Sequence, residues 1–439
     1  MDPILVGIIG IGVLIVLLAL GVHIALALAA VGMFGSMAII GFEPSIWLAT
    51  AFSFSYFSKS AFIVLPLFIY MGLMAGSGGI SHNIYEALKI WVGRLRAGLG
   101  IATVGSCTAF GVCTGSSLVA AAVFTRISAP EMRRQGYGKR TAYGVCTSAG
   151  SIGMLIPPSI LLVVYGIISE LSVGKLLIAG TAPGLVLAVS FSVGLWLMSL
   201  FRPAEFGSAP VEKVTWRQRI VSLGRVWPVL LLGGVIIGGI FGGLFSPTEA
   251  GAFGAAVITI LIILTTGSER WKILKEGSLE AIKINAMVFF ILVGAGIFAR
   301  FLMFSGITPM LLGAVVDAGF SNLTFIIIMA FIYLIMGCFL DSISMISITL
   351  PIIIPVVREM GIDPIYFAMV SVLAIECGLI TPPVGLNAYA AFGVAEPDVT
   401  LEDIFIGCLP FFFMMLAALA IMIAFPWLST ILPTLMLGD

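Results

Sequence analysis

The segment Gly-Met-Leu-Ile-Pro-Pro at residues 153–158 has a counterpart in Gly-Leu-Ile-Thr-Pro-Pro at residues 378–383. The offset is 225 residues (382 − 157), and holding it fixed from 113 to 158 gives eleven identities in 46 positions (158 − 113 + 1). Chance pairing would give only a few, so the chain contains an internal duplication. Proline removes a backbone donor and clashes with the carbonyl four residues earlier. Each double proline is therefore predicted to break a helix at the same place in its half.

The composition is that of a polytopic membrane protein. Of the 439 residues, 60% are hydrophobic and 10% are charged, whereas soluble domains carry roughly 25% charged residues. Mean hydropathy is +1.20, and apolar runs of about 20 residues recur, enough to span a bilayer core. The formal net charge is zero, so nothing indicates a nucleic-acid partner, and the six cysteines show no metal-ligand spacing. The acidic start, Met1-Asp2-Pro3, differs from a cleaved signal peptide, so the first apolar run is expected to be a retained helix.

The apolar runs follow the same order in two halves, residues 1–201 and 226–439, joined by a polar linker at 202–225. In the first half we expect crossings at 4–22, 24–41, 60–77 and 176–201, a re-entrant hairpin at 98–128 and a broken crossing at 139–169. In the second half we expect crossings at 226–243, 248–266, 284–304 and 404–430, a hairpin at 322–357 and a broken crossing at 363–393. Segments 44–58 and 80–93 are expected to be amphipathic helices in the membrane interface.

The basic residues predict which side of the membrane each loop faces. With the N-terminus outside, 17 of the 21 lysines and arginines fall in cytoplasmic loops, as the positive-inside rule requires. Both termini then lie in the periplasm and the linker 202–225 in the cytoplasm. Five crossings per half is an odd number, so the second half is inverted and the hairpins enter from opposite sides, which is typical of secondary transporters. The loop at 394–403 is expected in the cytoplasm although it is acidic.

The broken helices predict two cation sites. Backbone carbonyls freed in a membrane cost several kcal/mol each unless something satisfies them. Na⁺ prefers oxygen ligands, and each hairpin tip carries side-chain oxygens opposite a double proline. These are Thr114, Ser116 and Ser117 in hairpin one, and Asp341, Ser342 and Ser344 in hairpin two, where Thr381 of the broken helix adds a hydroxyl. The alternative is that the prolines are ordinary kinks and the hydroxyls make packing contacts.

Two carboxyl groups lie in these apolar segments. Glu376, shortly before Pro382, is either a functional group or a structural tie to unwound backbone. Asp341 is either a ligand or the cap of the hairpin tip. An aspartyl hydrolase needs two facing carboxylates, and the repeat mate of Asp341 is Ser116. The chain also contains no P-loop, His-Glu-x-x-His motif or nucleophile elbow, so we expect neither an enzyme nor an organic cofactor.

Several segments resemble the large membrane (permease) subunit of tripartite ATP-independent periplasmic (TRAP) transporters. The similarity runs essentially end to end, and its most specific parts are Ile-Pro-Pro-Ser at 156–159 and Gly-Leu-Ile-Thr-Pro-Pro-Val-Gly-Leu-Asn at 378–387. Further matching segments are 110–117, 130–137, 246–251 and 361–364. The family often has proline where His23 stands. It usually has Ser-Gly-Ser where this chain has Thr114-Gly115-Ser116, a departure that keeps the hydroxyl.

The resemblance implies an Na⁺-driven, elevator-type importer of the bacterial inner membrane. It would work with a small four-helix membrane subunit and a periplasmic substrate-binding protein, and import organic acids such as C4-dicarboxylates, sialic acid or other sugar acids. Segments 98–169 and 322–393 would form the mobile transport domain, and the remaining helices a scaffold. A standalone Na⁺/divalent-anion symporter, which needs no binding protein, is the alternative.

The resemblance also implies particular site residues. The first Na⁺ would lie near Thr114, Ser116, Ser117, Gly153, Ile156 and Pro158. The second would lie near Gly337, Gly378, Thr381 and Val384. The substrate would bind between the hairpin tips, with Asp341, Ser342, Ser344 and Asn387 as candidate contacts.

Overall fold

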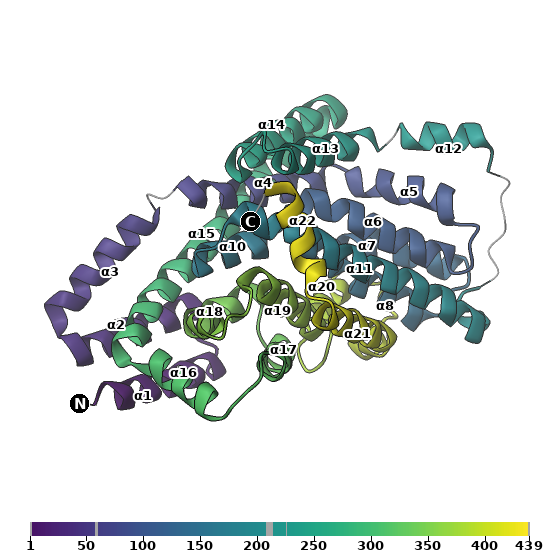
Figure 1. Cartoon of the computed structure of the whole chain (residues 1–439). Helices are drawn as coiled ribbons and strands as arrows, with labels where there is room; N and C mark the ends of the chain where they lie inside the picture. The colour runs from purple at the N-terminus through teal and green to yellow at the C-terminus, as the bar shows by residue number, and fades with distance from the viewer. Residues whose placement is uncertain (1, 58–59, 208–213, 225, 438–439) are drawn as a thin grey trace.

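The structure is a computed structural model that describes residues 2–57, 60–207, 214–224 and 226–437. Over these ranges the chain folds into α-helices that pack side by side (Figure 1). The β-pairing of the described chain is confined to one isolated bridge between Tyr137 and Phe206. The predicted all-α class is therefore confirmed.

The helices of the first half match the expected segments closely. The predicted crossings correspond to α1, α2, α4 and α11, the interfacial segments to α3 and α5, the hairpin to α6 and α7, and the broken crossing to α8–α10. The bounds are α1 (Pro3–Ala19), α2 (Ile24–Ile40), α3 (Phe42–Phe57), η1 (Ser60–Ile63), α4 (Val64–Ser77), α5 (Ile80–Val92), α6 (Gly98–Thr114), α7 (Ser117–Arg134), α8 (Lys139–Gly150), α9 (Ile152–Leu155), α10 (Ile160–Ser169) and α11 (Val173–Phe201).

The second half repeats this series. Adding 225 to the bounds of α7, 117–134, gives 342–359, which are the bounds of α18. The elements after α11 are η2 (Pro203–Glu205), α12 (Trp216–Leu223), α13 (Trp227–Phe241), α14 (Pro247–Thr265), η3 (Gly267–Glu269), α15 (Arg270–Ser305), α16 (Ile307–Asp317), α17 (Asn322–Gly337), α18 (Ser342–Glu359), α19 (Pro364–Gly378), α20 (Leu386–Phe392), α21 (Leu401–Ala424) and α22 (Trp427–Leu437).

Three differences from the expected segments have local causes. α15 begins at Arg270 rather than near 284, because its charged first turns contain good helix formers although they are not apolar. The crossing expected at 404–430 ends at Ala424, where Pro426 follows and a separate helix, α22, begins. The linker holds the helix α12, started by a capping box of Thr215 and Gln218. Linker residues 208–213 and 225 lie outside the described chain.

Several of these helices are suited to a membrane. Five described helices are long and apolar enough to cross one, and up to eight spans result if each bent helix pair counts once. The pair that contains the first double proline, α8–α9 with α10, is bent by 43°. α1 and α2, both expected to cross, have 17 residues each, the lower limit for a span. The chain is a multi-pass membrane protein, whereas ten crossings and re-entrant hairpins stay predictions.

The two halves contact each other through two equivalent pairs of helices, each made of one helix from either half. α7 packs against α20, and its mate α18 packs against α10, the mate of α20. At one end of the molecule Lys139, which begins α8, donates to the carbonyl oxygen of Asp398, after α20, at 3.0 Å. Elsewhere Arg358, near the end of α18 and shortly before α19, donates to the carbonyl of Ser169, which ends α10, at 2.8 Å. Each broken helix begins beside the end of the other, so the two run antiparallel.

The acidic loop before α21 lies against basic residues of the first half. Arg133 pairs with Glu396 and, at 2.8 Å, with Asp398. Lys139 pairs with Asp403 at 2.6 Å. The Arg133 guanidinium lowers the pKa of the Asp398 carboxyl below its ordinary value. The loop therefore lies at the same end of the molecule as the basic residues that the sequence predicts to be cytoplasmic.

A second, smaller hydrophobic core joins α1, α2 and α15. It contains Leu28, Phe298 and Phe301, and α18 packs against it through Ile343 and Ile348. α2 and α15 approach closely because glycine leaves room: a Cβ on Gly32 would lie 2.7 Å from the backbone nitrogen of Phe298. These helices thus have a core distinct from the larger one that contains both hairpins and both broken helices.

Candidate functional site

Each hairpin tip is a short turn whose last residue caps the following helix. In hairpin one Gly115 has φ +57°, and Ser116 is the N-cap of α7. In hairpin two Asp341, the repeat mate of Ser116, is the N-cap of α18. Its carboxylate accepts a bond from the backbone N–H of Ser344 at 3.0 Å and another from the Ser344 hydroxyl. The interpretation of Asp341 as a helix cap is confirmed, and its role as a ligand stays a prediction.

The helix breaks leave carbonyl oxygens without helical partners. The first break lies between α9 and α10 and the second between α19 and α20, and both Pro-Pro bonds are cis. Within the described chain, no backbone N–H donates to the carbonyls of Ile156, Pro157 or Pro158. The same holds at the second break for the carbonyls of Thr381, Pro382 and Pro383 among those residues. Two clusters of free carbonyl oxygens result, as the sequence predicts.

Each hairpin tip docks on the break of its own half. The backbone N–H of Ile160 donates to the carbonyl of Gly115 at 3.2 Å. In the second half the N–H groups of Val384 and Gly385 donate to the carbonyl of Cys338 at 3.0 and 3.3 Å. The tips are therefore held against the breaks by backbone hydrogen bonds in both copies, although the accepting residues, Gly115 and Cys338, are not repeat mates.

Paired glycines allow this close approach. A Cβ on Gly111 of α6 would lie 2.9 Å from the Cα of Gly153, before the first break. A Cβ on Gly337 of α17 would lie 2.8 Å from the Cα of Gly378, before the second break. Both contacts join backbone to backbone, so any larger side chain would force the helices apart.

The residues predicted for the two Na⁺ sites lie around these contacts. At the first break Thr114, Ser117, Gly153, Ile156 and Pro158 are all buried, and Ser116 is partly buried. At the second, the Thr381 hydroxyl donates to the carbonyl of Gly378 at 2.7 Å and lies 3.0 Å from the sulfur of Cys338. Val384, which donates to the carbonyl of Cys338, and Gly337, which contacts Gly378, also lie at the second break.

The donor chemistry fits a hard monovalent cation. The oxygens available are carbonyls and hydroxyls, the ligands that such an ion prefers. Among the described residues no group of three or more His, Cys, Asp or Glu could hold a transition metal. The two breaks differ in exposure, since Pro157 and Pro158 are buried whereas Pro382 and Pro383 are exposed.

A buried polar network lies between the two halves. The Ser117 hydroxyl donates to one carboxylate oxygen of Glu376 at 3.2 Å, and the Asn387 amide donates to the other at 3.4 Å. The same amide donates to the Ser151 hydroxyl at 3.1 Å. All four side chains are fully buried. Ser151 and Glu376 are repeat mates (151 + 225 = 376), so the network lies where the two copies meet.

The residues predicted to contact the substrate bond to other residues of the protein or are buried in it. Asn387 faces Glu376 and Ser151, and within the described chain its amide oxygen has no hydrogen-bond partner. Asp341 and Ser344 bond to each other, and Ser342 is buried. Sequence reasoning singled out Glu376 but missed Ser151. The repeat alignment that pairs position 151 with 376 could have pointed to it.

The sequence matches one family over most of its length. Residues 11–428 match the DctM component of the tripartite ATP-independent periplasmic transporters. The C4-dicarboxylate TRAP transporter large permease protein DctM of Pseudomonas aeruginosa is 33% identical over 405 residues, which cover 92% of this chain and 93% of that protein. The sialic acid TRAP transporter large permease protein SiaM of Vibrio cholerae is 29% identical over 381 residues, covering 86% and 87%.

A solved structure shares the fold. The YdaH transporter of Alcanivorax borkumensis superimposes with a TM-score of 0.63 at 15% sequence identity, over 89% of this chain and 90% of that one. At this identity the likeness concerns the fold, which is that of a transporter structure. The family match over nearly the whole sequence and the 33% identity to a curated relative lead to one conclusion: the chain belongs to the DctM family, the large permease subunits of TRAP transporters.

Proposed function

We propose that this chain is the translocating subunit of an Na⁺-coupled importer in the bacterial inner membrane. It receives an organic acid from a periplasmic substrate-binding protein and works beside a small four-helix membrane subunit. Two Na⁺ ions bind, one at each helix break. The subunit carries its cargo without chemical change, so it needs no organic cofactor.

The docking of both hairpin tips on both broken helices supports this proposal most. At each break, carbonyl oxygens without backbone partners lie beside hydroxyl groups in a largely apolar protein. Free carbonyls at membrane depth are tolerated where they line a binding site, and broken helices in corresponding repeats indicate such a site in transporters. At the first break, one bound Na⁺ would satisfy the free carbonyl oxygens of Ile156 and Pro158.

The residues of the chain have separate parts in this proposal. At the first site Thr114, Ser116, Ser117 and the carbonyls of Gly153, Ile156 and Pro158 hold the ion. At the second site the ion lies near Gly337, Gly378, Thr381 and Val384, where the Thr381 hydroxyl and backbone oxygens hold it. The Gly115–Ile160 and Cys338–Val384 bonds hold each tip in place. Substrate then binds between the ordered tips, near Asp341, Ser342, Ser344 and Asn387.

The same geometry favours an elevator movement. The hairpins and broken helices form the moving body, and α1, α2 and α15 form part of the scaffold. The small core that joins these three helices supports the division, and α15 also contributes Val288 and Leu292 to the larger core. The apolar contact of α18 with this core would lie on the sliding surface.

The class of cargo is an organic acid, without a single acid being assigned. The two relatives above are named for C4-dicarboxylates and for sialic acid, which share carboxylate groups. Half-helix N-termini such as that of α10 at Ser159 carry positive dipole ends that favour a carboxylate. The binding protein would select among the acids.

The test is uptake of radiolabelled organic acid into proteoliposomes that contain both membrane subunits. Uptake should require an inward Na⁺ gradient and the loaded binding protein on the periplasmic face. Full uptake without the Na⁺ gradient would contradict Na⁺ coupling. Full uptake without the binding protein would instead favour the standalone Na⁺/divalent-anion symporter.

A further inference from the structure

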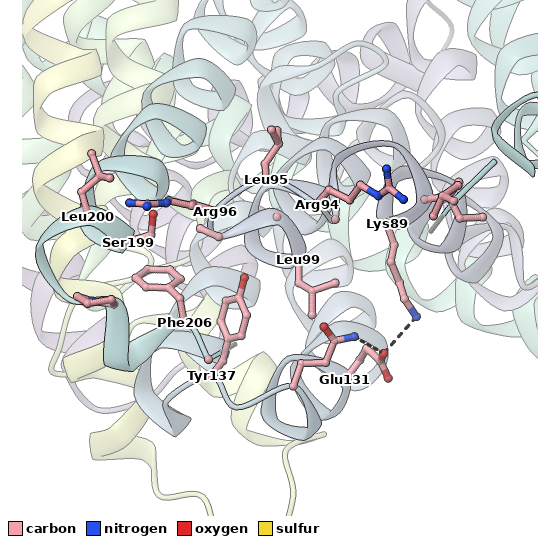
Figure 2. Close-up of a pocket in the computed structure, with 18 residues that line it drawn as sticks. Lys89, Arg94, Leu95, Arg96, Leu99, Glu131, Tyr137, Ser199, Leu200 and Phe206 are labelled. Carbon is pink, nitrogen blue, oxygen red and sulfur yellow. Dashed lines mark hydrogen bonds and ion pairs between the residues drawn. The ribbon is translucent and has the colours of Figure 1, made fainter. Parts of the chain in front are cut away.

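A cavity of 770 Å³ lies at the junction of α5, α6 and the end of α11, and no residue of either helix break lines it (Figure 2). Three cationic side chains line it, Lys89, Arg94 and Arg96, against the single carboxylate of Glu131. The cavity is therefore electropositive and suited to an anion.

Among the cations of the lining, Arg96 supplies charge that no ion pair with a described residue neutralises. Lys89 pairs with Glu131 at 3.1 Å and with Glu86 at 3.4 Å. Arg96 is exposed and has neither an ion pair nor a hydrogen bond to a described residue. Figure 2 shows its guanidinium beside Ser199, across the cavity from Lys89. A bound anion would meet Arg96 without displacing a protein carboxylate.

Aromatic residues place the cavity at the depth of lipid headgroups. Next to it α12 packs on α5, where Trp91 and Trp216 meet edge to face with ring centroids 6.5 Å apart. The guanidinium of Arg219 lies 4.9 Å from the centroid of Trp216. Tryptophan and basic residues together are typical of the membrane–water interface. A cavity in this layer opens to headgroups rather than to hydrocarbon.

The N-terminus of α6 adds a positive electrostatic field that favours a bound anion. Ala97 and Gly98 line the cavity, and the first turn of α6 has neither an acidic residue nor a side-chain cap at its N-cap. The positive end of the helix dipole there stabilises an anion. Tyr137 and Leu99 also line the cavity at this end of the helix.

We propose that this cavity binds the phosphate of an anionic phospholipid headgroup, with Arg96 as its main charged contact. One guanidinium group can donate two parallel N–H···O bonds to two oxygens of the same phosphate. Basic pockets between membrane helices on the cytoplasmic side suit anionic headgroups, and that is the side to which the positive-inside rule assigns these residues. The bound lipid would fix α5 and α12 to the membrane surface beside hairpin one. This inference does not depend on the proposed cargo or on Na⁺ coupling.

Native mass spectrometry of the purified full chain, titrated with phosphatidylglycerol, tests the proposal. Arg96→Gln should weaken saturable binding about fivefold, and the double variant Arg94→Gln/Arg96→Gln should weaken it further. Arg96→Lys, which keeps the charge, should retain most of the binding. Arg217→Gln on the exposed face of α12, outside the lining, is the matched control and should bind as the unchanged chain does. The melting temperature of each variant checks that it folds.

Two further ligands identify the source of the phosphate. Phosphatidylcholine, which has no net charge, should bind roughly tenfold more weakly than phosphatidylglycerol. Glycerol 1-phosphate, which lacks acyl chains, should not displace the bound lipid. Equal binding of glycerol 1-phosphate and lipid would overturn the proposal in favour of a soluble phosphate ligand. Equal losses in Arg96→Gln and Arg217→Gln would overturn it by showing a general surface-charge effect.

Discussion

Glu376 is a buried residue through which one half of the chain contacts the other. Its carboxylate accepts bonds from Ser117 of the first half and Asn387 of the second. In the described chain no lysine, arginine or histidine pairs with it. A buried carboxyl in a membrane segment is rare and usually functional. Here it also connects hairpin one to both broken helices, so a movement of either one disturbs it.

Replacing Glu376 by alanine should destabilise the protein strongly. The Ser117 hydroxyl and the Asn387 amide would lose their acceptor, at a cost of about 1–3 kcal/mol for each unpaired donor. Glu376→Gln keeps one acceptor oxygen and should lose less. The measurement is the melting temperature in detergent, with Glu359→Ala at the exposed end of α18 as the control. Equal melting of Glu376→Ala and the unchanged chain would show that the network is not structural.

Arg133 should stabilise the protein in a pH-dependent way. It lowers the pKa of Asp398 in the folded chain, so the stabilisation is present above the unfolded pKa and is lost as pH falls through the folded pKa. Arg133→Gln should lower the melting temperature at pH 7; the difference should begin to shrink below about pH 4 and disappear once pH has fallen past the lowered pKa of folded Asp398. Arg134→Gln, an exposed neighbour, is the matched control. A difference that persists at low pH would contradict the ion-pair explanation.

At the scale of elements, the hairpins and broken helices form two units of the same design. In each unit a glycine of the first hairpin helix contacts a glycine before the double proline, and the tip bonds to the backbone after it. The units are not equivalent, because Thr381 adds a hydroxyl where the first copy has Ile156. Exposure differs as well, since only the second double proline is exposed.

Gly378→Ala should open the second unit and leave the first intact. The new Cβ would lie 2.5 Å from the Cα of Gly337, and backbone cannot move aside cheaply. If Na⁺ binds at both breaks, its thermal stabilisation of the protein should fall, because one of two binding contributions is lost. Gly234→Ala in α13 is the control, since nothing lies within 4 Å of its Cβ position. An unchanged Na⁺ effect in Gly378→Ala would remove the second site from the proposal.

At the scale of the whole molecule, the two halves interlock in antiparallel fashion. α8 begins beside the end of α20, and α19 begins beside the end of α10. A bilayer imposes opposite surroundings on the two ends, and Arg133, Lys139 and Arg140 lie together at one of them, against the acidic loop. This arrangement supports the predicted inversion of the second half.

Thiol labelling tests that inversion directly. Lys139→Cys should react only with a reagent added from the cytoplasm, and Arg358→Cys only with one added from the periplasm. The native cysteines are a small background, because five of the six are buried and Cys338 is partly buried. Labelling of both positions from one side would refute the inverted topology.

Much of the fold is predictable from local sequence patterns. Apolar runs, double prolines and turn residues act within a few residues of themselves, so they set the helices and their breaks. The bounds of α6–α10 and α17–α20 follow from these patterns. α16 and α22 were missed, and α15 was expected to be shorter, because charged or short helical segments give no span-length hydropathy signal.

The amino-acid sequence by itself determined the duplication, the two breaks and the hydroxyl groups placed opposite them. It determined these because a helix responds to its own residues and a repeat preserves their spacing. Only the tertiary structure decided that Ser151 joins Glu376 and Asn387, and that the acidic loop lies against Arg133 and Lys139. These contacts join residues more than 200 positions apart, and packing of one half against the other brings them together. Apart from the repeat offset that pairs Ser151 with Glu376, spacing along the chain carries no record of that packing.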